Sequence, residues 1–405
     1  MSFPSSFRPR VLTSPLLKML ALPWPWIRFA LMAALVLLAS TILLKYDNLL
    51  LWKITLGVTE LSLRLLVPSI LLALWSLLST PHQTRHFTTI GSLLAAVTFT
   101  FPAIQSHSVA EKVHRDLQDI RAGNTEVPVP KFSMNYRAWL FGTEIEHVRP
   151  EPYDYSKETA AKRDLWFYRA KNIIAPAPCL VVIHGGSWES GDKSEFPQWA
   201  SYWAKRGYAV ASINYRLAPI YTWPAPKEDV AAAIAFLKTK AAEFKLDPTR
   251  FVLVGRSAGA QIATASACLL KDQSIRGCVA FYGPADMLFA WENGSADDIM
   301  NTPLLLGQYL NGSPQTALPR FLDSSAIYNV TSECPPTLLL HGARDVLVWN
   351  LQSRRLKAQL DQHHVPNVYL ELPWATHAFD YIYDGPGSQL ARYTIDAFLQ
   401  KILAQ

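Results

Sequence analysis

The sequence predicts an α/β domain built on a mostly parallel sheet, preceded by an N-terminal bundle of about three transmembrane helices. From about residue 161 onward, short apolar runs bounded by glycine and proline alternate with helical patterns. These short runs are apolar at successive positions, which is typical of strands buried on both faces. Residues 1–106 instead hold three longer apolar runs. A chain of 405 residues that is 50% apolar and only 17% charged is neither a disordered tail nor a small disulfide scaffold.

The positive charge of the chain is confined to its N-terminal quarter. Residues 1–105 carry the whole net charge of +6, and the other 300 residues are neutral overall. A nucleic-acid-binding domain usually carries an excess of basic side chains. We therefore predict no nucleic-acid partner.

The three apolar runs predict membrane spans at 26–45, 63–80 and 87–105. The first contains 16 uncharged residues between Arg28 and Lys45, with aromatic residues at both ends, which is about the length that crosses a bilayer. Three runs in succession favour an integral membrane region over a cleaved signal peptide. The second run is interrupted by Pro68. In the alternative interpretation one run is a buried or interfacial helix, and residues 46–63 lie along the membrane surface.

Loop charges predict on which side of the membrane the large domain lies. The first 28 residues hold four basic side chains and no acidic one, which favours a cytoplasmic N-terminus. With three spans, the large domain is then on the exterior, periplasmic or lumenal side. Basic residues after the third run oppose this orientation, and two spans would reverse it.

Residues 107–160 are predicted to form an irregular junction, since several prolines interrupt them, and residues 161–405 a folded domain. The predicted strands are Asp164–Arg169, Cys179–His184, Tyr208–Tyr215, Phe251–Gly255, Gly277–Tyr282, Pro336–His341 and Val368–Leu372. The predicted helices are Glu195–Arg206, Ala225–Phe244, Ala258–Leu270, Leu351–His363 and Ser388–Ala404.

A G-x-S-x-G pattern spans residues 255–259, between the apolar run FVLVG and the helical pattern AQIATASACLL. A sharp turn between a strand and a helix lifts a serine hydroxyl clear of the backbone, and the glycines leave room for that turn. This context predicts that Ser257 is a nucleophile rather than a helix-capping residue.

A predicted strand ends at His184, and two glycines follow it, about 70 residues before Ser257. Acyl transfer requires N–H donors that point at the developing oxyanion, and glycines expose backbone amides without side chains in the way. The predicted oxyanion-hole residues are Gly185, Gly186, Ser187 and Ala258.

Asp345 and His377 each follow a later predicted strand, which gives the order Ser, Asp, His along the chain. This order is that of the α/β-hydrolases. His377 is predicted to take the proton from Ser257, and Asp345 to orient the imidazole. Asp380 is a weaker candidate for the acid, because it follows the histidine. His341 and His363 are weaker candidates for the base, since one precedes the acid and the other ends a helix.

Residues 163–405 resemble the α/β-hydrolases, in particular the carboxylesterase branch that includes hormone-sensitive-lipase-like esterases. The segments HGGSWESGDK, WAKRGYAVASINYRLAP, WPAPKEDVAAAIAFL and VGRSAGAQIA carry the resemblance. The lipase-like group usually shows HGGG, GDSAGG and HGF where this chain has HGGS, GRSAGA and HAF. The HGGSW and GxSAGA segments are more similar to prenylcysteine methylesterase, kynurenine formamidase and feruloyl or acetyl-xylan esterase relatives. The resemblance implies ester hydrolysis and leaves the acyl group and the alcohol open.

Residues 284–334 do not follow the alternation of strands and helices and are rich in Met, Leu, Phe and Trp. An insertion at this place usually roofs the substrate pocket of the fold, and the alternative is an ordinary surface subdomain. The four cysteines lack C-x-x-C spacing, so buried free thiols are expected. A bridge between Cys268 and Cys278 is the alternative for an exported domain. We expect no metal and no cofactor, since a serine triad needs neither.

The sequence thus predicts a membrane-anchored serine esterase with a small-molecule or lipid-like ester substrate, of undetermined oligomeric state. Three alternatives remain open. The same triad serves an acyltransferase or an amide or formamide hydrolase, and a catalytically silent hydrolase fold serves as a binding module.

Overall fold

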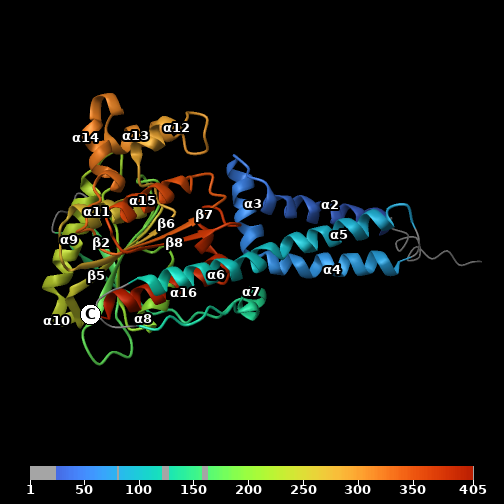
Figure 1. Cartoon of the computed structure of the whole chain (residues 1–405), viewed down its shortest axis with the longest axis horizontal. Coiled ribbons are helices and arrows are strands. Elements are labelled where there is room, and N and C mark those ends of the chain that lie inside the picture. Colours follow the sequence, from blue (N-terminus) through green and yellow to red (C-terminus); the bar gives the residue numbers. More distant parts are fainter. Residues whose placement is uncertain (1–23, 80–81, 121–126, 157–162, 405) are drawn as a thin grey trace, which may run out of the picture.

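The computed structural model describes residues 24–79, 82–120, 127–156 and 163–404 (Figure 1). Several predictions from the sequence lie outside these residues. They concern the basic residues before position 24, residue 80 at the end of the second predicted span, and residue 161 at the start of the predicted hydrolase domain.

The large domain is organised around an eight-stranded sheet in the order β1-β2-β4-β3-β5-β6-β7-β8. The strands β3 to β8 are parallel, whereas β1 pairs antiparallel with β2 and β2 pairs antiparallel with β4. Their bounds are β1 Glu151–Asp154, β2 Asp164–Tyr168, β3 Ala177–Ile183, β4 Ala209–Ile213, β5 Leu246–Arg256, β6 Ile275–Phe281, β7 Thr337–Gly342 and β8 Asn367–Leu372. A mostly parallel sheet of this order, covered on both faces, gives the α/β-hydrolase fold.

Helices cover both faces of the sheet. One face packs against α6, α8 and α16, and the other packs against α9 and α11. Two further helices, α10 and α15, also belong to the large domain. The bounds of all seven are α6 Phe101–Asp119, α8 Pro197–Lys205, α9 Ala225–Thr239, α10 Ala241–Phe244, α11 Ala258–Leu269, α15 Leu351–Gln362 and α16 Pro386–Leu403. The central strands β3 and β5 are almost wholly buried, which explains their continuous apolar runs.

The seven predicted strands all exist, with ends that differ by up to five residues. The edge strand β1 was not predicted, and the single helix predicted for 225–244 is divided into α9 and α10 at Lys240. The prediction of an irregular junction at 107–160 was wrong for part of that range. Helix α6 continues to Asp119, and a short helix, α7 Tyr136–Phe141, and β1 follow it.

The N-terminal region forms α2 Trp24–Leu43, α3 Leu49–Glu60, α4 Ser62–Leu78 and α5 Arg85–Phe99. In Figure 1, α2, α4 and α5 lie side by side and project away from the sheet, whereas α3 crosses between them and the large domain. By length and composition, two helices of the described chain are able to span a membrane, α2 and the continuous helix of residues 85–119. The pair of α3 and α4 is a third span only if the two count as one despite a bend of 79°. The predicted three-helix transmembrane bundle is therefore not confirmed.

The helices α3 and α4 are attached to the large domain through Glu60, which is fully buried at the bend. Its side-chain Oε2 accepts a hydrogen bond from the backbone N–H of Gly387 at 3.1 Å. Its backbone carbonyl accepts a hydrogen bond from Trp139 Nε1 at 2.8 Å. Helix α6 is bound to the same domain, since Ala110, Val113 and Leu117 belong to the main apolar core. The N-terminal helices and the sheet thus share one packed junction.

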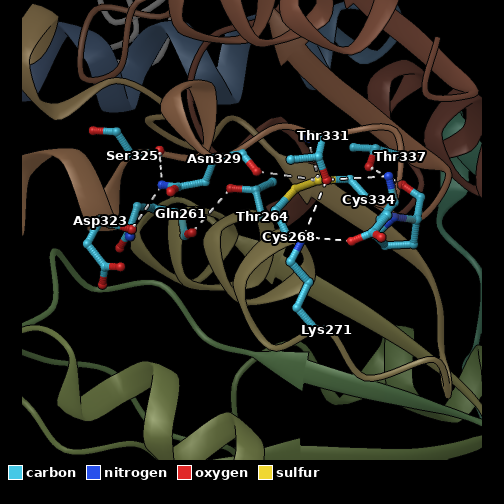
Figure 2. Close-up of a disulfide and its surroundings, with 12 residues drawn as sticks. Gln261, Thr264, Cys268, Lys271, Asp323, Ser325, Asn329, Thr331, Cys334 and Thr337 are labelled. Atoms are coloured by element: carbon cyan, nitrogen blue, oxygen red, sulfur yellow. Dashed lines mark hydrogen bonds and ion pairs between the residues drawn. A yellow bond between two sulfur atoms is a disulfide. The ribbon is translucent and has the colours of Figure 1, made fainter. Parts of the chain in front are cut away.

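The segment between β6 and β7 forms α12 Met287–Asn293, α13 Thr302–Leu310, α14 Pro314–Ser324 and the short 3₁₀ helix η1 Ala326–Tyr328. These helices sit above the sheet beside α11 and α15 (Figure 1). Beside them, a disulfide joins Cys268 at the end of α11 to Cys334 before β7 (Figure 2). The expectation of buried free thiols was therefore wrong for Cys268, and the alternative bridge from Cys268 to Cys278 was wrong as well. The expectation is confirmed for Cys179 and Cys278, which are free and buried.

Candidate active site

Ser257 lies on a sharp turn between β5 and α11. Its backbone has φ of 52° and ψ of −119°, a strained conformation for a residue with a side chain. The flanking glycines are required by close packing. A Cβ at Gly255 would meet the carbonyl oxygen of Gly259 at 2.2 Å, and a Cβ at Gly259 would meet that of Ile183 at 2.2 Å. The turn therefore holds the serine at the carboxyl end of the sheet, as the G-x-S-x-G pattern predicts.

A chain of hydrogen bonds connects Ser257, His377 and Asp345. Ser257 Oγ lies 3.0 Å from His377 Nε2, and His377 Nδ1 lies 2.7 Å from Asp345 Oδ2. A carboxylate only accepts hydrogen bonds, so Nδ1 carries a proton and Nε2 is free to accept the serine proton. The three predicted residues, which are far apart in the sequence, are thus brought together in the geometry of a nucleophile, a base and an orienting acid.

Asp345 is held as a buried carboxylate. Burial alone would raise its pKa, but the neighbouring His377 and His341 outweigh burial and lower the pKa of Asp345 to about 2. Its Oδ1 also accepts hydrogen bonds from the backbone N–H groups of Leu347 and Val348, both at 2.9 Å. Asp345 therefore keeps its charge, and that charge favours a protonated Nδ1 on His377.

The predicted oxyanion-hole residues line one cavity together with Ser257. Within the described ranges, no hydrogen-bond acceptor is found for the backbone N–H groups of Gly186, Ser187 and Ala258. Gly186 has a φ of +101°, and a Cβ there would meet the carbonyl oxygen of Ser190 at 2.1 Å, so only glycine fits. Gly185 adjoins Gly186, and its carbonyl accepts a hydrogen bond from Tyr215.

His184 is a structural residue of the same loop. Burial lowers the pKa of His184 to about 4, so the ring is neutral at pH 7 and donates from Nδ1 to the carbonyl of Gly185 at 2.7 Å. The ring stacks on Tyr215 with centroids 4.4 Å apart. These contacts fix the backbone of the glycine loop.

The weaker candidates of the sequence analysis have other partners. His341 is buried, with Nδ1 at 2.7 Å from Ser353 Oγ and Nε2 at 3.2 Å from Asp345 Oδ2, so it supports the acid and does not reach Ser257. His363 caps the C-terminus of α15. Asp380 pairs with Arg256 at 2.6 Å rather than with His377.

Arg256, Asp380 and Tyr282 form a buried cluster that the sequence analysis did not identify. Arg256 occupies the first of the two variable positions of the G-x-S-x-G pattern, directly before Ser257, so the motif itself gives no signal for it. Asp380 accepts a hydrogen bond from the Tyr282 hydroxyl, and the Tyr282 ring lies 4.4 Å from the His377 ring. The cluster joins the turn that carries Ser257 to the loop that carries His377.

The cavity at Ser257 has a volume of about 860 Å³. Apolar side chains from α12, α13, the segment between them and the loop after β7 form much of its wall. These include Phe289, Met300, Leu305, Leu306, Leu347 and Val348. The segment between β6 and β7 thus contributes side chains to the wall of this cavity. Among the residues that the structure describes, no group of three or more His, Cys, Asp or Glu side chains is arranged to hold a metal ion.

Residues 165–360 match the family model described as BD-FAE. The chain is 31% identical over 260 residues to the probable carboxylic ester hydrolase LipM of Mycobacterium tuberculosis, covering 60% of this chain and 58% of that protein. It is 29% identical to the esterase LipC of the same organism, covering 61% of this chain and 64% of that protein. The chain therefore spans less than two thirds of the length of these relatives.

Solved structures of esterases are similar in fold. A bacterial heroin esterase superposes with a TM-score of 0.54 at 22% identity, covering 66% of this chain and 87% of that chain. The thermophilic esterase Est2 of Thermogutta terrifontis gives a TM-score of 0.51 at 20% identity, covering 62% of this chain and 92% of that chain. At this identity the matches show the α/β-hydrolase fold. Together with the sequence relatives, they support an α/β-hydrolase esterase family.

Proposed function

We propose that this chain is a membrane-anchored serine carboxylic-ester hydrolase. The observation that carries the proposal is the hydrogen-bonded series from Ser257 through His377 to Asp345, at the wall of a largely apolar pocket. Its similarity to carboxylic ester hydrolases points to the same reaction class.

In this proposal Ser257 Oγ attacks the ester carbonyl while His377 Nε2 takes its proton. The amides of Gly186, Ser187 and Ala258, with Gly185 shaping the loop, stabilise the oxyanion. His377 then gives the proton to the leaving alcohol, and an acyl-enzyme remains on Ser257. Water activated by His377 releases the carboxylic acid and restores the serine.

We also propose that the N-terminal helices anchor the protein in a membrane, with the large domain on the exterior, periplasmic or lumenal side. Apolar side chains on α4 and α5 are largely exposed, including Leu71, Leu78, Phe87, Leu94 and Val97, as expected for surfaces that face lipid. The disulfide between Cys268 and Cys334 favours an oxidising compartment. Three spans with a cytoplasmic N-terminus agree with that side.

The reaction is tested with p-nitrophenyl esters of increasing acyl length, using the detergent-solubilised full chain. We expect hydrolysis by the native chain and a loss of at least about 10³-fold in kcat for Ser257→Ala. Ser108→Ala is the matched control, because Ser108 is exposed on α6 and does not line the pocket.

Two other results would contradict the proposal. Hydrolysis that persists in Ser257→Ala contradicts the proposed nucleophile. A folded native chain that hydrolyses no ester overturns the proposal. Amide substrates, added alcohol acceptors and a fluorophosphonate probe then distinguish amide hydrolysis, acyl transfer and a silent binding module.

A further inference from the structure

The N-terminal region contributes to the wall of the candidate active site. Asp47, in the turn between α2 and α3, lines the same cavity as Ser257 although the two lie about 200 residues apart in the sequence. The preceding residue, Tyr46, lies near Arg344, next to the orienting acid. Burial lowers the pKa of Arg344, and the Tyr46 phenol acts in the opposite direction. The turn of residues 44–48 is therefore part of the pocket rim as well as a connection between helices.

The charged groups around this pocket are mostly acidic. Among the described residues that line it, the carboxyl groups are those of Asp47, Glu195 and Asp298, and the one Lys or Arg side chain is Arg256. Arg256 is committed to Asp380, with its Nε 2.6 Å from Oδ2. The carboxylate of Asp298 accepts hydrogen bonds from the backbone N–H groups of Met300 and Thr302. Among the described lining residues, an anionic substrate group would therefore meet carboxyl groups and no Lys or Arg side chain that is free to pair with it.

The rest of the cavity wall and its rim can accommodate hydrocarbon groups of a substrate. Helices α12 and α13 supply apolar side chains to the wall. Trp349 and Tyr381 also line the cavity, and they remain 43% and 70% exposed. On α3, directly after Asp47, Leu49 and Leu50 are 48% and 66% exposed. Exposed apolar side chains are therefore found both at the pocket and on the first turn of α3, the helix that crosses between the N-terminal bundle and the large domain (Figure 1).

We infer that the turn of residues 44–48 is a specificity element, and that Asp47 makes the site select uncharged lipophilic esters over esters with an anionic group close to the scissile bond. This inference rests on the proposed ester hydrolysis and names its substrate class. Asp47 acts through space. Its carboxylate repels a second negative charge bound in the same cavity, because the effective dielectric constant near a protein surface is well below that of water.

Two esters of the same length test the inference, p-nitrophenyl valerate and p-nitrophenyl hydrogen glutarate. They differ only in that a terminal methyl group is replaced by a carboxylate. The full chain in a non-ionic detergent is expected to prefer valerate. Asp47→Asn should lower the ratio of kcat/KM for valerate to that for glutarate by about threefold, and Asp47→Lys by about tenfold. Raising the salt concentration should lower the same ratio for the native chain.

The matched control is Asp119→Lys. It makes the same change in net charge at an exposed position at the end of α6 and should leave the ratio unchanged. If Asp47→Lys hydrolyses the esters with the native ratio, the inference is wrong and the proposed function stands. If the folded native chain hydrolyses neither ester, the proposed function fails and the inference fails with it.

Discussion

At the scale of single residues, the proposed reaction depends on three side chains, those of Ser257, His377 and Asp345. In the proposed mechanism the serine loses a proton, His377 Nε2 accepts it, and the Asp345 carboxylate keeps the other imidazole proton at Nδ1. The distances of 3.0 Å and 2.7 Å place each group within hydrogen-bond reach. The low pKa of Asp345, about 2, keeps that carboxylate ionised in the range where esterases work.

Asp345→Asn should lower kcat by about 10³- to 10⁴-fold, because an amide N–H directed at Nδ1 favours the tautomer whose Nε2 cannot accept the serine proton. Asp116→Asn, on the surface of α6, is the control. Because the pKa of Asp345 is lowered to about 2, this carboxylate stays ionised throughout the assay range, and its own titration should not change kcat/KM between pH 4 and 9. The measurement is p-nitrophenyl butyrate hydrolysis from pH 4 to 9. A variant within tenfold of native kcat contradicts the assigned roles.

The residue types and their order made these three predictable from the sequence. The supporting residues were not predictable in the same way. Arg256 occupies a position that the nucleophile motif leaves free, and Asp380 was considered only as an alternative acid. Their contact is made across 124 positions of sequence, so only the folded chain reveals it.

At the scale of elements, the site depends on how the β5–α11 turn is held against the loop after β8. The Arg256 guanidinium is stacked between aromatic rings, 4.2 Å from the Phe196 centroid and 4.7 Å from that of Phe281. It is 2% exposed and paired with Asp380. A buried charge that loses its partner strongly lowers the stability of a protein, whereas an exposed ion pair contributes little to stability.

Asp380→Asn should therefore destabilise the chain by about 3–5 kcal/mol, because the Arg256 charge stays buried without its counter-ion. Asp361→Asn, which breaks the surface pair with Lys357, should cost less than about 1 kcal/mol. Urea unfolding of the detergent-solubilised chain, followed by tryptophan fluorescence, gives both values. The double variant Arg256→Met with Asp380→Asn should recover part of the loss. Equal losses for Asp380→Asn and Asp361→Asn would show that the buried pair does not hold the two loops together.

Apolar runs in the sequence predicted the strands β2 to β8, because a strand that is buried in the sheet needs apolar residues at most of its positions. The strand β1, with sequence EPYD and half-exposed residues, carries no such signal. Pro68 suggested an interruption inside the second apolar run, but helix α4 continues through this residue and the bend between α3 and α4 lies at Leu61. A separate segment before α4 was considered only in the alternative interpretation.

At the scale of the whole molecule, the N-terminal helices and the large domain are joined by buried contacts. Glu60, Trp139 and Gly387 belong to three distant segments and meet at one junction. The division into residues 1–106, 107–160 and 161–405, with the cap at 284–334, stays a prediction. The pairing of Cys268 with Cys334 could not be predicted from the sequence, because these two cysteines are 66 positions apart and approach each other only in the folded chain.

The proposed orientation predicts how cysteines react from outside the cell. A cysteine introduced by Ala358→Cys on the exposed side of α15 should react with a membrane-impermeant maleimide in intact spheroplasts. The native chain should not react, since Cys268 and Cys334 are bridged, and burial raises the pKa of the Cys278 thiol to about 12 and that of Cys179 further. Labelling of Ala358→Cys only after lysis would place the domain in the cytoplasm.

Covalent labelling tests whether Ser257 is an activated nucleophile. The native, detergent-solubilised chain is treated with a fluorophosphonate probe, digested and examined by mass spectrometry. We expect a single adduct on the peptide that contains Ser257, which forms slowly or not at all in Asp345→Asn and is absent from Ser257→Ala. A folded native chain that forms no adduct, or that forms one on another serine, would contradict this expectation.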